Sequence, residues 1–344
     1  MLLFLAFAGG LWALGWHFGT PRSARWTMIG LLYVAVLALL LVLPEGHPLA
    51  VALGESFGEW LTLGALAGAV WIYSEGLKKL RGRVRPENRP DIAQPPTAQD
   101  TTRRNARHIA LREIGGPGQK RLGAAKVLVV GAGGLGSPAL QYLAAAGVGT
   151  IGVIDDDVVE VTNLQRQVIH TDDRTGMPKV FSAEIAMRAQ NPSVAVRPYN
   201  RRLEADIAEA LFADYDLILD GSDNFETRYL VNRAAFATGK PLIAAALSQW
   251  EGQISTYAPR DGTPCYACVF PKPPAPGLAP SCAEAGVLGP LPGVMGAMMA
   301  VEAVKEIVDA GDGLRGRMLI YDALHGETRT IRLKRRAGCP VCGG

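Results

Sequence analysis

The sequence predicts an α/β fold with a doubly wound, mostly parallel sheet and an antiparallel C-terminal section, behind a set of apolar helices. Between residues 127 and 247, short β-branched runs alternate with helical stretches, which is the pattern of parallel strands joined by helices. Strand-like runs at residues 252–257, 318–321 and 328–333 predict the antiparallel section. Long apolar runs in the first 77 residues predict transmembrane helices.

Composition fits one large domain with an appendage. Hydrophobic residues make up 49% of the 344 residues, which is enough for a sizeable core. The net charge of +3 is too small to predict a nucleic-acid partner. Four of the five cysteines lie in two C-x-x-C pairs, which is typical of metal or redox chemistry rather than of a disulfide framework.

Three apolar runs open the chain, at residues 1–19, 27–43 and 60–73. A helix needs about 20 apolar residues to cross a bilayer. The first two runs qualify narrowly, and the third qualifies if it extends to residue 77 or begins near residue 57. We therefore expect a membrane anchor of three transmembrane helices over residues 1–77.

The basic residues predict how this anchor is oriented. The expected spans place Arg22, Arg25 and a cluster at residues 78–89 on one side of the membrane. The loop expected at residues 45–59, which has no Lys or Arg, lies on the other side. Because positively charged loops stay in the cytoplasm, the N-terminus is expected outside and the C-terminal region inside. This predicts a multi-pass protein of the inner, cytoplasmic membrane.

Two alternatives for the anchor stay open at this point. Residues 1–19 could be a cleaved signal peptide, although they lack a basic n-region. The third run could lie in the membrane interface, which would leave two spans and move the C-terminal region outside. After the anchor, residues 78–102 read as a linker, first basic and then Pro-rich, and residues 103–344 as a soluble domain. At the start of this domain, residues 107–112 are expected to be helical, and the glycines that follow are expected to end the helix.

A glycine-rich turn follows the first predicted strand, at residues 127–130. The pattern G-x-G-x-x-G is formed by Gly131, Gly133 and Gly136, with an additional Gly134. Glycines let a backbone approach phosphate, and the N-terminus of the helix that follows favours negative charge. The turn therefore predicts a Rossmann-like nucleotide-binding unit.

An acid and two cations extend this unit. Asp155 follows the second predicted strand, where an acid accepts the ribose hydroxyls of a nucleotide. These features alone fit an NAD-dependent oxidoreductase equally well. Arg166 and Lys179 favour a triphosphate instead, because its charge must be neutralised before a nucleophile can approach phosphorus.

Seven motifs occur in the order and spacing of one family: GAGGLG, DDDVVEVTNLQRQ, GMPKV, DGSDN, CYAC, CAEAGV and CPVC. They resemble the ubiquitin-activating-enzyme superfamily, in its bacterial branch of molybdopterin-synthase and thiamine-biosynthesis adenylyltransferases. The resemblance covers about residues 104–344 and none of the first hundred residues.

The resemblance implies a role for each matching residue. Asp223 would bind Mg²⁺, for which a carboxylate at a strand end is suited. Arg107 would reach ATP bound to a partner subunit, which implies a homodimer. The catalytic set would be Arg107, Arg166, Lys179 and Asp223. The nucleotide-binding set would be Gly133, Gly134, Asp155, Asp157, Thr162, Asn163, Leu164, Gln165, Arg166, Lys179, Asp223 and Asn224. Taken singly, Lys179 could be a solvated lysine and Asp223 a helix cap.

The cysteines predict a structural metal site. Four thiolates at C-x-x-C spacing make a tetrahedral zinc site, with a redox dithiol as the alternative. The predicted ligands are Cys265, Cys268, Cys339 and Cys342. Cys282 follows a Pro- and Gly-rich run, and relatives of the thiamine branch use a cysteine here in sulfur transfer. We treat Cys282 as a candidate nucleophile, with an idle loop thiol as the alternative.

The reaction that the resemblance implies is ATP-dependent adenylation of a ubiquitin-like sulfur-carrier protein at its C-terminal Gly-Gly carboxylate. The expected carrier is of the type of the molybdopterin-synthase small subunit, and activation prepares it for thiocarboxylate formation in molybdenum cofactor biosynthesis. A separate protein is expected to donate the sulfur. The alternatives are the thiamine-biosynthesis carrier, an NAD-dependent oxidoreductase and a membrane-tethered binding protein without catalysis.

Overall fold

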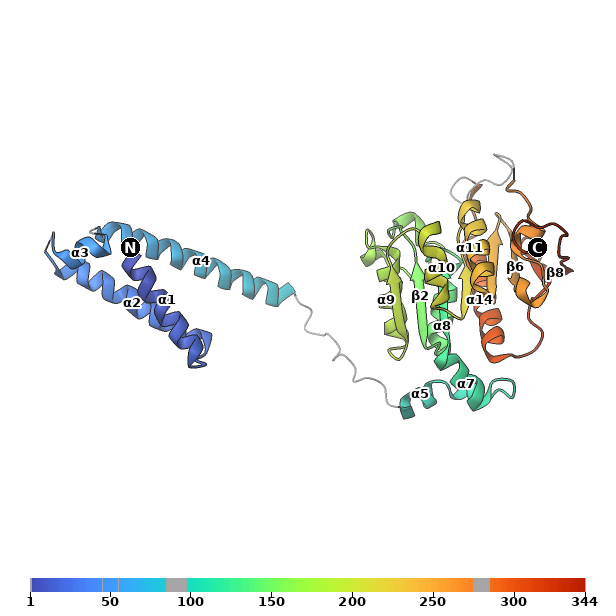
Figure 1. Ribbon diagram of the computed structural model, residues 1–344, viewed down its shortest axis with the longest axis horizontal. Coiled ribbons are helices and arrows are strands. Elements are labelled where there is room, and N and C mark those ends of the chain that lie inside the picture. Colours follow the sequence, from blue (N-terminus) through green and yellow to red (C-terminus); the bar gives the residue numbers. More distant parts are fainter. Residues whose placement is uncertain (1, 45, 55, 85–97, 275–284, 344) are drawn as a thin grey trace. The chain divides into compact units, whose positions relative to one another are not determined.

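The computed structural model of the chain describes residues 2–44, 46–54, 56–84, 98–274 and 285–343 (Figure 1). It separates the chain into two units, Met1–Ile92 and Ala93–Gly344. The expected linker at residues 78–102 is helical at both ends, since one helix extends to Val84 and another covers Ala98–Arg104, and residues 85–97 lie outside the described part.

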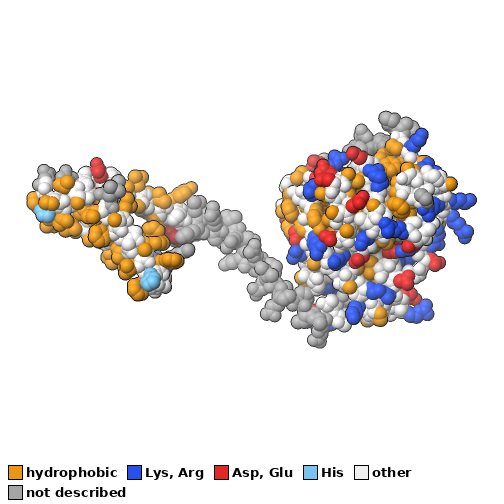
Figure 2. All heavy atoms as spheres, in the orientation of Figure 1, with side chains coloured by type: hydrophobic (Ala, Val, Ile, Leu, Met, Phe, Trp, Pro, Cys, Tyr) orange, Lys and Arg blue, Asp and Glu red, His pale blue; other side chains and the backbone are white. Residues whose placement is uncertain are grey.

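The N-terminal unit is helical. Its helices are α1 Leu2–His17, α2 Arg22–Val42, α3 Pro48–Leu53 and α4 Phe57–Val84. A small core forms where Trp60 packs against Leu53 and Val36, and the indole of Trp60 donates a hydrogen bond to the Leu53 carbonyl at 3.1 Å. Most of the exposed large hydrophobic side chains of the described residues lie in this unit, and Figure 2 shows its surface as mainly apolar.

Three transmembrane helices were expected, and fewer of the described helices meet the requirements for a span. Among the described helices, one stretch is long and apolar enough to cross a membrane, the 20 residues Ser23–Val42 within α2. The apolar part of α1, Leu3–His17, is shorter than a bilayer requires. The helix α4 has 28 residues, but Glu59 and Glu75 border its apolar part. By length and composition, one described helix therefore qualifies as a span, where the sequence predicted three.

The C-terminal unit contains an eight-stranded mixed sheet, in the order β3-β2-β1-β4-β5-β6-β7-β8. The strands are β1 Lys126–Val130, β2 Thr150–Ile154, β3 Ala195–Tyr199, β4 Leu217–Asp220, β5 Leu242–Leu247, β6 Glu251–Tyr257, β7 Arg317–Asp322 and β8 Glu327–Arg332. The first five pair in parallel, and β6, β7 and β8 pair antiparallel. The prediction of a parallel sheet with an antiparallel C-terminal section is confirmed.

Helices cover both faces of the parallel part (Figure 1). The helices of this unit are α5 Ala98–Arg104, α6 Ala106–Ile109, α7 Gly115–Ala124, α8 Gly136–Ala146, α9 Lys179–Gln190, α10 Ala205–Ala213, α11 Phe225–Thr238, α12 Tyr266–Val269 and α14 Pro290–Val308, with 3-10 turns η1 Val161–Asn163, η2 Asp172–Arg174 and η3 Pro259–Asp261. Alternate residues of β1 enter different cores. Val127 and Val129 pack with α8, α9 and α14, whereas Leu128 and Val130 pack with α10 and α11. This alternation explains why the strand is apolar throughout.

Two local expectations were wrong. Residues 107–112 were expected to be helical and to end at the glycines, but α6 ends at Ile109 and α7 begins at Gly115. A helix can start there because Gly115 adopts φ 58°, a left-handed conformation that turns the chain before Pro117. The segment 45–59, expected to be a loop, contains the short helix α3.

The strand order places the functional end of the sheet. From β1 the chain runs outward to β2 and β3 and then returns to β4 on the other side. Loops at the carboxyl ends of β1 and β4 therefore diverge and leave a crevice, which is where ligands bind in open α/β sheets.

Candidate active site

A cleft of about 990 Å³ lies at the carboxyl ends of the parallel strands. It brings together most of the residues that the sequence singled out: Gly133, Gly134, Asp155, Asp157, Arg166, Lys179, Asp223 and Asn224. These residues come from the loops after β1, β2 and β4 and from the start of α9. The topology therefore assembles parts that lie up to about 90 residues apart in the sequence.

The glycine loop forms the floor of the cleft. Gly131 adopts φ 92°, and a Cβ there would lie 3.2 Å from the Gly221 carbonyl oxygen, so only glycine fits. A Cβ on Gly136 would collide with the Gly131 carbonyl, which explains how α8 packs so closely under the loop. The amide N–H groups of Gly133 and Gly134 donate to no described residue. They remain available to an anion.

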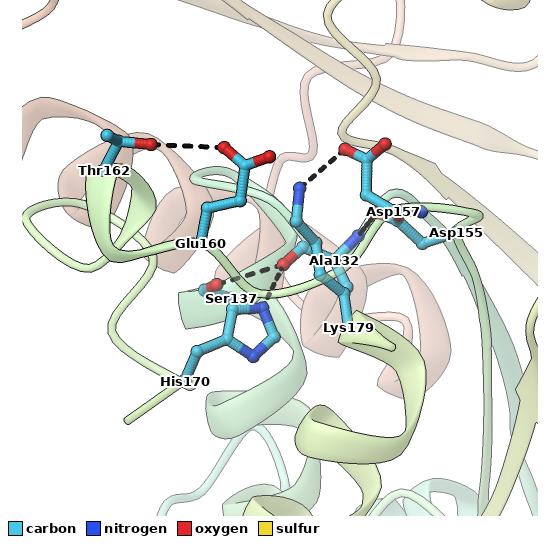
Figure 3. A network of polar contacts seen from close by, with 8 residues as sticks. All are labelled: Ala132, Ser137, Asp155, Asp157, Glu160, Thr162, His170 and Lys179. Carbon is cyan, nitrogen blue, oxygen red and sulfur yellow. Dashed lines mark hydrogen bonds and ion pairs between the residues drawn. The ribbon is translucent and has the colours of Figure 1, made fainter. Parts of the chain in front are cut away.

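Three side chains hold the backbone N–H and the backbone carbonyl of Ala132 (Figure 3). Its N–H donates to Asp155 Oδ2 at 2.7 Å. Its carbonyl oxygen lies 2.9 Å from His170 Nε2 and accepts a hydrogen bond from the Ser137 hydroxyl at 3.3 Å. The loop is therefore fixed by groups from three different elements.

Asp155 connects the loop to the ribose side of the cleft. Its second oxygen accepts the backbone N–H of Asp157 at 2.9 Å, so each carboxylate oxygen keeps a lone pair for a further donor. Burial raises the pKa of Asp155, although the amide of Ala132 and the charge of Lys179 oppose the shift. The position fits the predicted role of accepting ribose hydroxyls.

Lys179 is the first residue of α9 and reaches into the cleft. Its ammonium lies 2.7 Å from Asp157 Oδ2 (Figure 3), and its side chain is 7% exposed against 65% for Asp157. Its backbone N–H also donates to the Asp157 carbonyl at 2.9 Å. Asp157 therefore holds Lys179 in position through both its backbone and its side chain.

The loop after β4 carries the candidate metal ligand. Asp223 is exposed and lines the cleft. Asn224, rather than Asp223, caps the helix α11, since its side-chain oxygen accepts the Thr227 N–H at 2.9 Å. Beneath this loop, the buried Arg228 donates hydrogen bonds to the carbonyls of Ser222 and, at 2.8 Å, Ala245. Asp223 is thereby left free for a ligand.

The four predicted metal ligands meet in one buried cluster, with all Sγ atoms within 4.8 Å of one another. Sulfur separations are 3.9 Å for Cys265 and Cys268, 3.6 Å for Cys265 and Cys339, and 3.4 Å for Cys268 and Cys342. Tetrahedral ligands about 2.3 Å from zinc lie about 3.8 Å apart, whereas a disulfide needs about 2.05 Å. The geometry fits zinc and does not fit two disulfides.

Residues 105–341 match the ThiF family. The chain belongs to this family. The match begins after the N-terminal unit and spans the cleft and all four cluster cysteines. It confirms the resemblance that the motifs carried.

Several known proteins are similar to a large part of this chain. "Sulfur carrier protein adenylyltransferase" of Thermus thermophilus is 50% identical over 69% of this chain and 89% of that protein. "SAMP-activating enzyme E1" of Haloferax volcanii is also 50% identical, over 70% of this chain and 88% of that protein. Mouse "Adenylyltransferase and sulfurtransferase MOCS3" is 46% identical over 77% of this chain but only 59% of its own length.

Solved structures support the fold alone. Escherichia coli MccB has a TM-score of 0.63 at 23% identity, over 72% of this chain and 73% of that one. PaaA has a TM-score of 0.59 at 21% identity, over 85% of this chain and 91% of that one. The mixed sheet is therefore an architecture that distant sequences share.

Part of the predicted ThiF-type site does not line the cleft. This part comprises Thr162, Asn163, Leu164 and Gln165. The buried Asn163 instead accepts the backbone N–H groups of Arg166 and Gln167 on its carbonyl, at 3.1 and 3.0 Å. The carbonyl of Thr162 accepts the Arg166 guanidinium at 3.0 Å. The segment therefore acts as a frame that aims Arg166 into the cleft.

Two further predicted residues lie elsewhere. Arg107 lies in α6, is exposed, and does not line the cleft of its own chain. Cys282 lies outside the described residues, so its candidate role stays a prediction.

The cleft also contains residues that the sequence did not single out, namely Gln167, Arg201, Arg202, Tyr266, Phe270 and Lys272. Gln167 is 4% exposed, and its Oε1 has no partner among the described residues. Arg201 and Arg202 follow β3, a strand that we did not predict. The order of the strands, once known, would have pointed to both arginines, because β3 ends beside β2.

Proposed function

We propose that this chain uses ATP to adenylate the C-terminal Gly-Gly carboxylate of a ubiquitin-like sulfur-carrier protein. One observation carries the proposal: the free amides of the glycine loop, the acid Asp155 and the cations Arg166 and Lys179 line a single cleft. Two relatives at 50% identity, named as a sulfur-carrier adenylyltransferase and a SAMP-activating E1, support the reaction class.

The residues present suffice for this chemistry without a general base. A carboxylate is already ionised, so its oxygen can attack the α-phosphorus, form the acyl-adenylate and release pyrophosphate. The protein must neutralise charge and hold the groups in line. Arg166 and Lys179 supply positive charge, the amides of Gly133 and Gly134 bind phosphate oxygens, and Asp155 orients the ribose.

The cleft has two ends, and each favours one substrate. Asp155, Arg201 and Arg202 line the end beside β2 and β3, which is where the nucleoside lies in such folds. The other end, beside β5 and β6, is lined by Tyr266 and Phe270, whose rings lie 4.8 Å apart. We assign the second end to the tail of the carrier, since a narrow aromatic wall suits residues without side chains.

Two metals complete the proposal. Asp223 would hold Mg²⁺, which neutralises phosphate charge when bound. Zn²⁺ would bind the four thiolates of Cys265, Cys268, Cys339 and Cys342 as a structural ion that ties the C-terminal tail to α12.

We also propose a homodimer. Arg107 is exposed and lies outside the cleft of its own chain, so it can serve a phosphate only in the cleft of a second copy. Two variants test this together: Arg107→Ala and Lys179→Met should each be inactive alone, and their coexpression should restore activity. A mixed dimer has one site with both lesions and one intact site. Absence of restoration in proven mixed dimers would remove the role of Arg107 in the partner.

The N-terminal unit is proposed to anchor the enzyme in the inner membrane by three helices, with the catalytic domain in the cytoplasm. Its many exposed apolar side chains would be costly in water, which supports burial in lipid beyond the one span Ser23–Val42. Orientation with Arg22 and Arg25 inside follows from the positive-inside rule.

The proposal also concerns which carrier protein is the substrate. We place the molybdopterin-synthase type first and the thiamine-biosynthesis type second, and a separate protein donates the sulfur. ATP–pyrophosphate exchange by the full-length protein, with purified carriers of both types, is the decisive measurement. Exchange should appear with one carrier and vanish when its terminal Gly-Gly is removed. Binding of NAD rather than ATP in a thermal-shift assay, without exchange, would favour an oxidoreductase.

A further inference from the structure

The buried side of the glycine loop contains a histidine that the reaction does not use directly. His170 is 5% exposed, and its two ring nitrogens contact different elements. Nε2 lies 2.9 Å from the Ala132 carbonyl oxygen, and Nδ1 lies 2.9 Å from the hydroxyl of Ser182 in the first turns of α9. The ring therefore bridges the phosphate loop and the helix that begins with Lys179. Figure 3 shows its contact with Ala132.

The partners determine which nitrogen of His170 carries the proton. A carbonyl oxygen only accepts, so the nitrogen that faces Ala132 must be Nε2–H. In a neutral ring Nδ1 is then bare and accepts the hydrogen of the Ser182 hydroxyl. Burial, and the nearby charges of Lys179 and Arg174, lower the pKa of His170 to about 4, so the ring is neutral at pH 7.

The hydrogen bond to Ala132 also determines where the next amide points. In a trans peptide the C=O and the following N–H point in opposite directions. A carbonyl of Ala132 that is held toward His170 therefore directs the Gly133 N–H away from the core, and Gly133 lines the cleft. This peptide could rotate cheaply without such a hold, because glycine tolerates a wide range of φ.

We propose that His170 is a positioning residue that locks the Ala132–Gly133 peptide with its N–H toward the phosphates of ATP. It works with Asp155, which holds the N–H on the other side of Ala132 at 2.7 Å. If the peptide turned over, a carbonyl dipole would face the phosphates where an N–H now does. The inference rests on the proposed use of ATP at this loop, and the tautomer of the ring does not depend on that function.

The test compares substitutions that keep different halves of the ring. In His170→Gln the amide nitrogen can take the place of Nε2, whereas in His170→Asn the amide is too short to reach Ala132. Loss of one amide contact to a charged phosphate corresponds to a roughly 10- to 100-fold rise in the KM for ATP. We expect that rise in His170→Asn and His170→Ala, with the KM for the carrier unchanged and His170→Gln close to wild type. His325→Gln, at an exposed histidine in the turn after β7, is the matched control.

A purely structural role would behave differently. It would lower the melting temperature and the active fraction without a selective change in the KM for ATP. Equal KM values in His170→Asn and His170→Gln would overturn the lock. Should His170→Ala fail to fold, the Gln and Asn pair still decides the question.

The tautomer provides a second readout. Nitrogen-15 spectra of the full-length protein in detergent should show one of its five histidines as the Nε2–H tautomer, without titration between about pH 5.5 and 8, and His170→Gln should remove that signal. A Nδ1–H tautomer would overturn the assignment. A wild type that shows the expected tautomer but no exchange would count against the proposed function alone.

Discussion

The ammonium of Lys179 lies 2.7 Å from Asp157 Oδ2, and a phosphate that enters the cleft would compete with that carboxylate. The two partners differ in exposure, since the lysine side chain is almost buried and the aspartate is mostly solvated. The pair therefore contributes little as a salt bridge, and its lysine is the partner that matters for the reaction.

The first prediction separates these two residues. Lys179→Met should lower the rate of ATP–pyrophosphate exchange by about 10²–10³, because a cation that stabilises developing charge is lost. Asp157→Asn should change the rate by less than about fivefold, since the interactions of an exposed carboxylate are screened. Steady-state exchange at saturating ATP measures both. A large loss in Asp157→Asn with normal melting would place Asp157 among the ligands of the nucleotide or its metal.

Substitutions of the neighbouring residues Asp223 and Asn224 should have different effects, one on activity and the other on stability. Asn224→Ala removes the cap of α11 and should cost about 1 kcal/mol in the free energy of unfolding, while Asn224→Ser should retain most of it. Asp223→Ala should leave unfolding unchanged and reduce exchange by about 10²–10³ through loss of the metal ligand. Denaturant melts and exchange assays on the three variants measure this. Normal exchange in Asp223→Ala would mean that another residue holds Mg²⁺.

At the scale of elements, the sequence pattern predicted the buried strands and the edge strand β8 but missed β3, the strand at the other edge of the sheet. The strands β1 and β4 are apolar on both faces, so their runs stand out in the sequence. The strand β3 contains Arg197 and Pro198, which only the edge position beside β2 tolerates. Sequence alone could not identify that edge strand. For the same reason it did not identify Arg201 and Arg202, which follow the strand.

The candidate site shows the same division. Residues in the first positions after strands, such as Asp155 and Asp223, were predictable because the carboxyl ends of parallel strands converge. His170 was not predictable, because its contact with Ala132 joins residues 38 positions apart through a loop without regular structure. Asn163 carries the family motif yet lies outside the cleft lining, since a motif preserves the frame of a site as well as its contacts.

The zinc site allows a prediction about α12 and the C-terminal tail. Burial raises the pKa of Cys265 and of Cys268, so without a metal these thiols would stay protonated and the tail would lose its tie. Cys339→Ser should reduce zinc from about one per chain to well below one and lower the melting temperature. Atomic absorption and thermal melts measure this. The control Cys282→Ser, at the one cysteine outside the two C-x-x-C pairs, should retain the metal. A metal-free wild type with a normal melt would contradict the site.

At the scale of the whole molecule, the number of spans decides on which side of the membrane the enzyme works. Three spans, with Arg22 and Arg25 inside, place residue 85 in the cytoplasm. If Ser23–Val42 alone crosses with the same arginines inside, residue 85 lies outside and away from ATP. The need for ATP therefore restricts the number of spans that the anchor can have.

This gives the topology prediction. A reporter fused after residue 85 should be active only in a format that works in the cytoplasm, and one inserted between residues 46 and 54 only in a format that works outside. Activity of the first fusion in the outside format would eliminate the three-span arrangement. Fusions at both positions in one strain background control for expression.

Tyr266 lies between two of the zinc ligands in the sequence Cys265-Tyr266-Ala267-Cys268, and its ring forms part of the cleft wall. The Tyr266 side chain is buried and its ring packs against those of Tyr229, Tyr257 and Phe270, so the ring has little freedom of its own. An ion bound at the rear of this short helix would therefore shape the surface that we propose for the carrier tail. Cells short of zinc, or exposed to oxidants that consume thiols, would then accumulate chains whose nucleotide end is intact and whose acceptor end is misshapen, so that metal supply would limit sulfur mobilisation before ATP does.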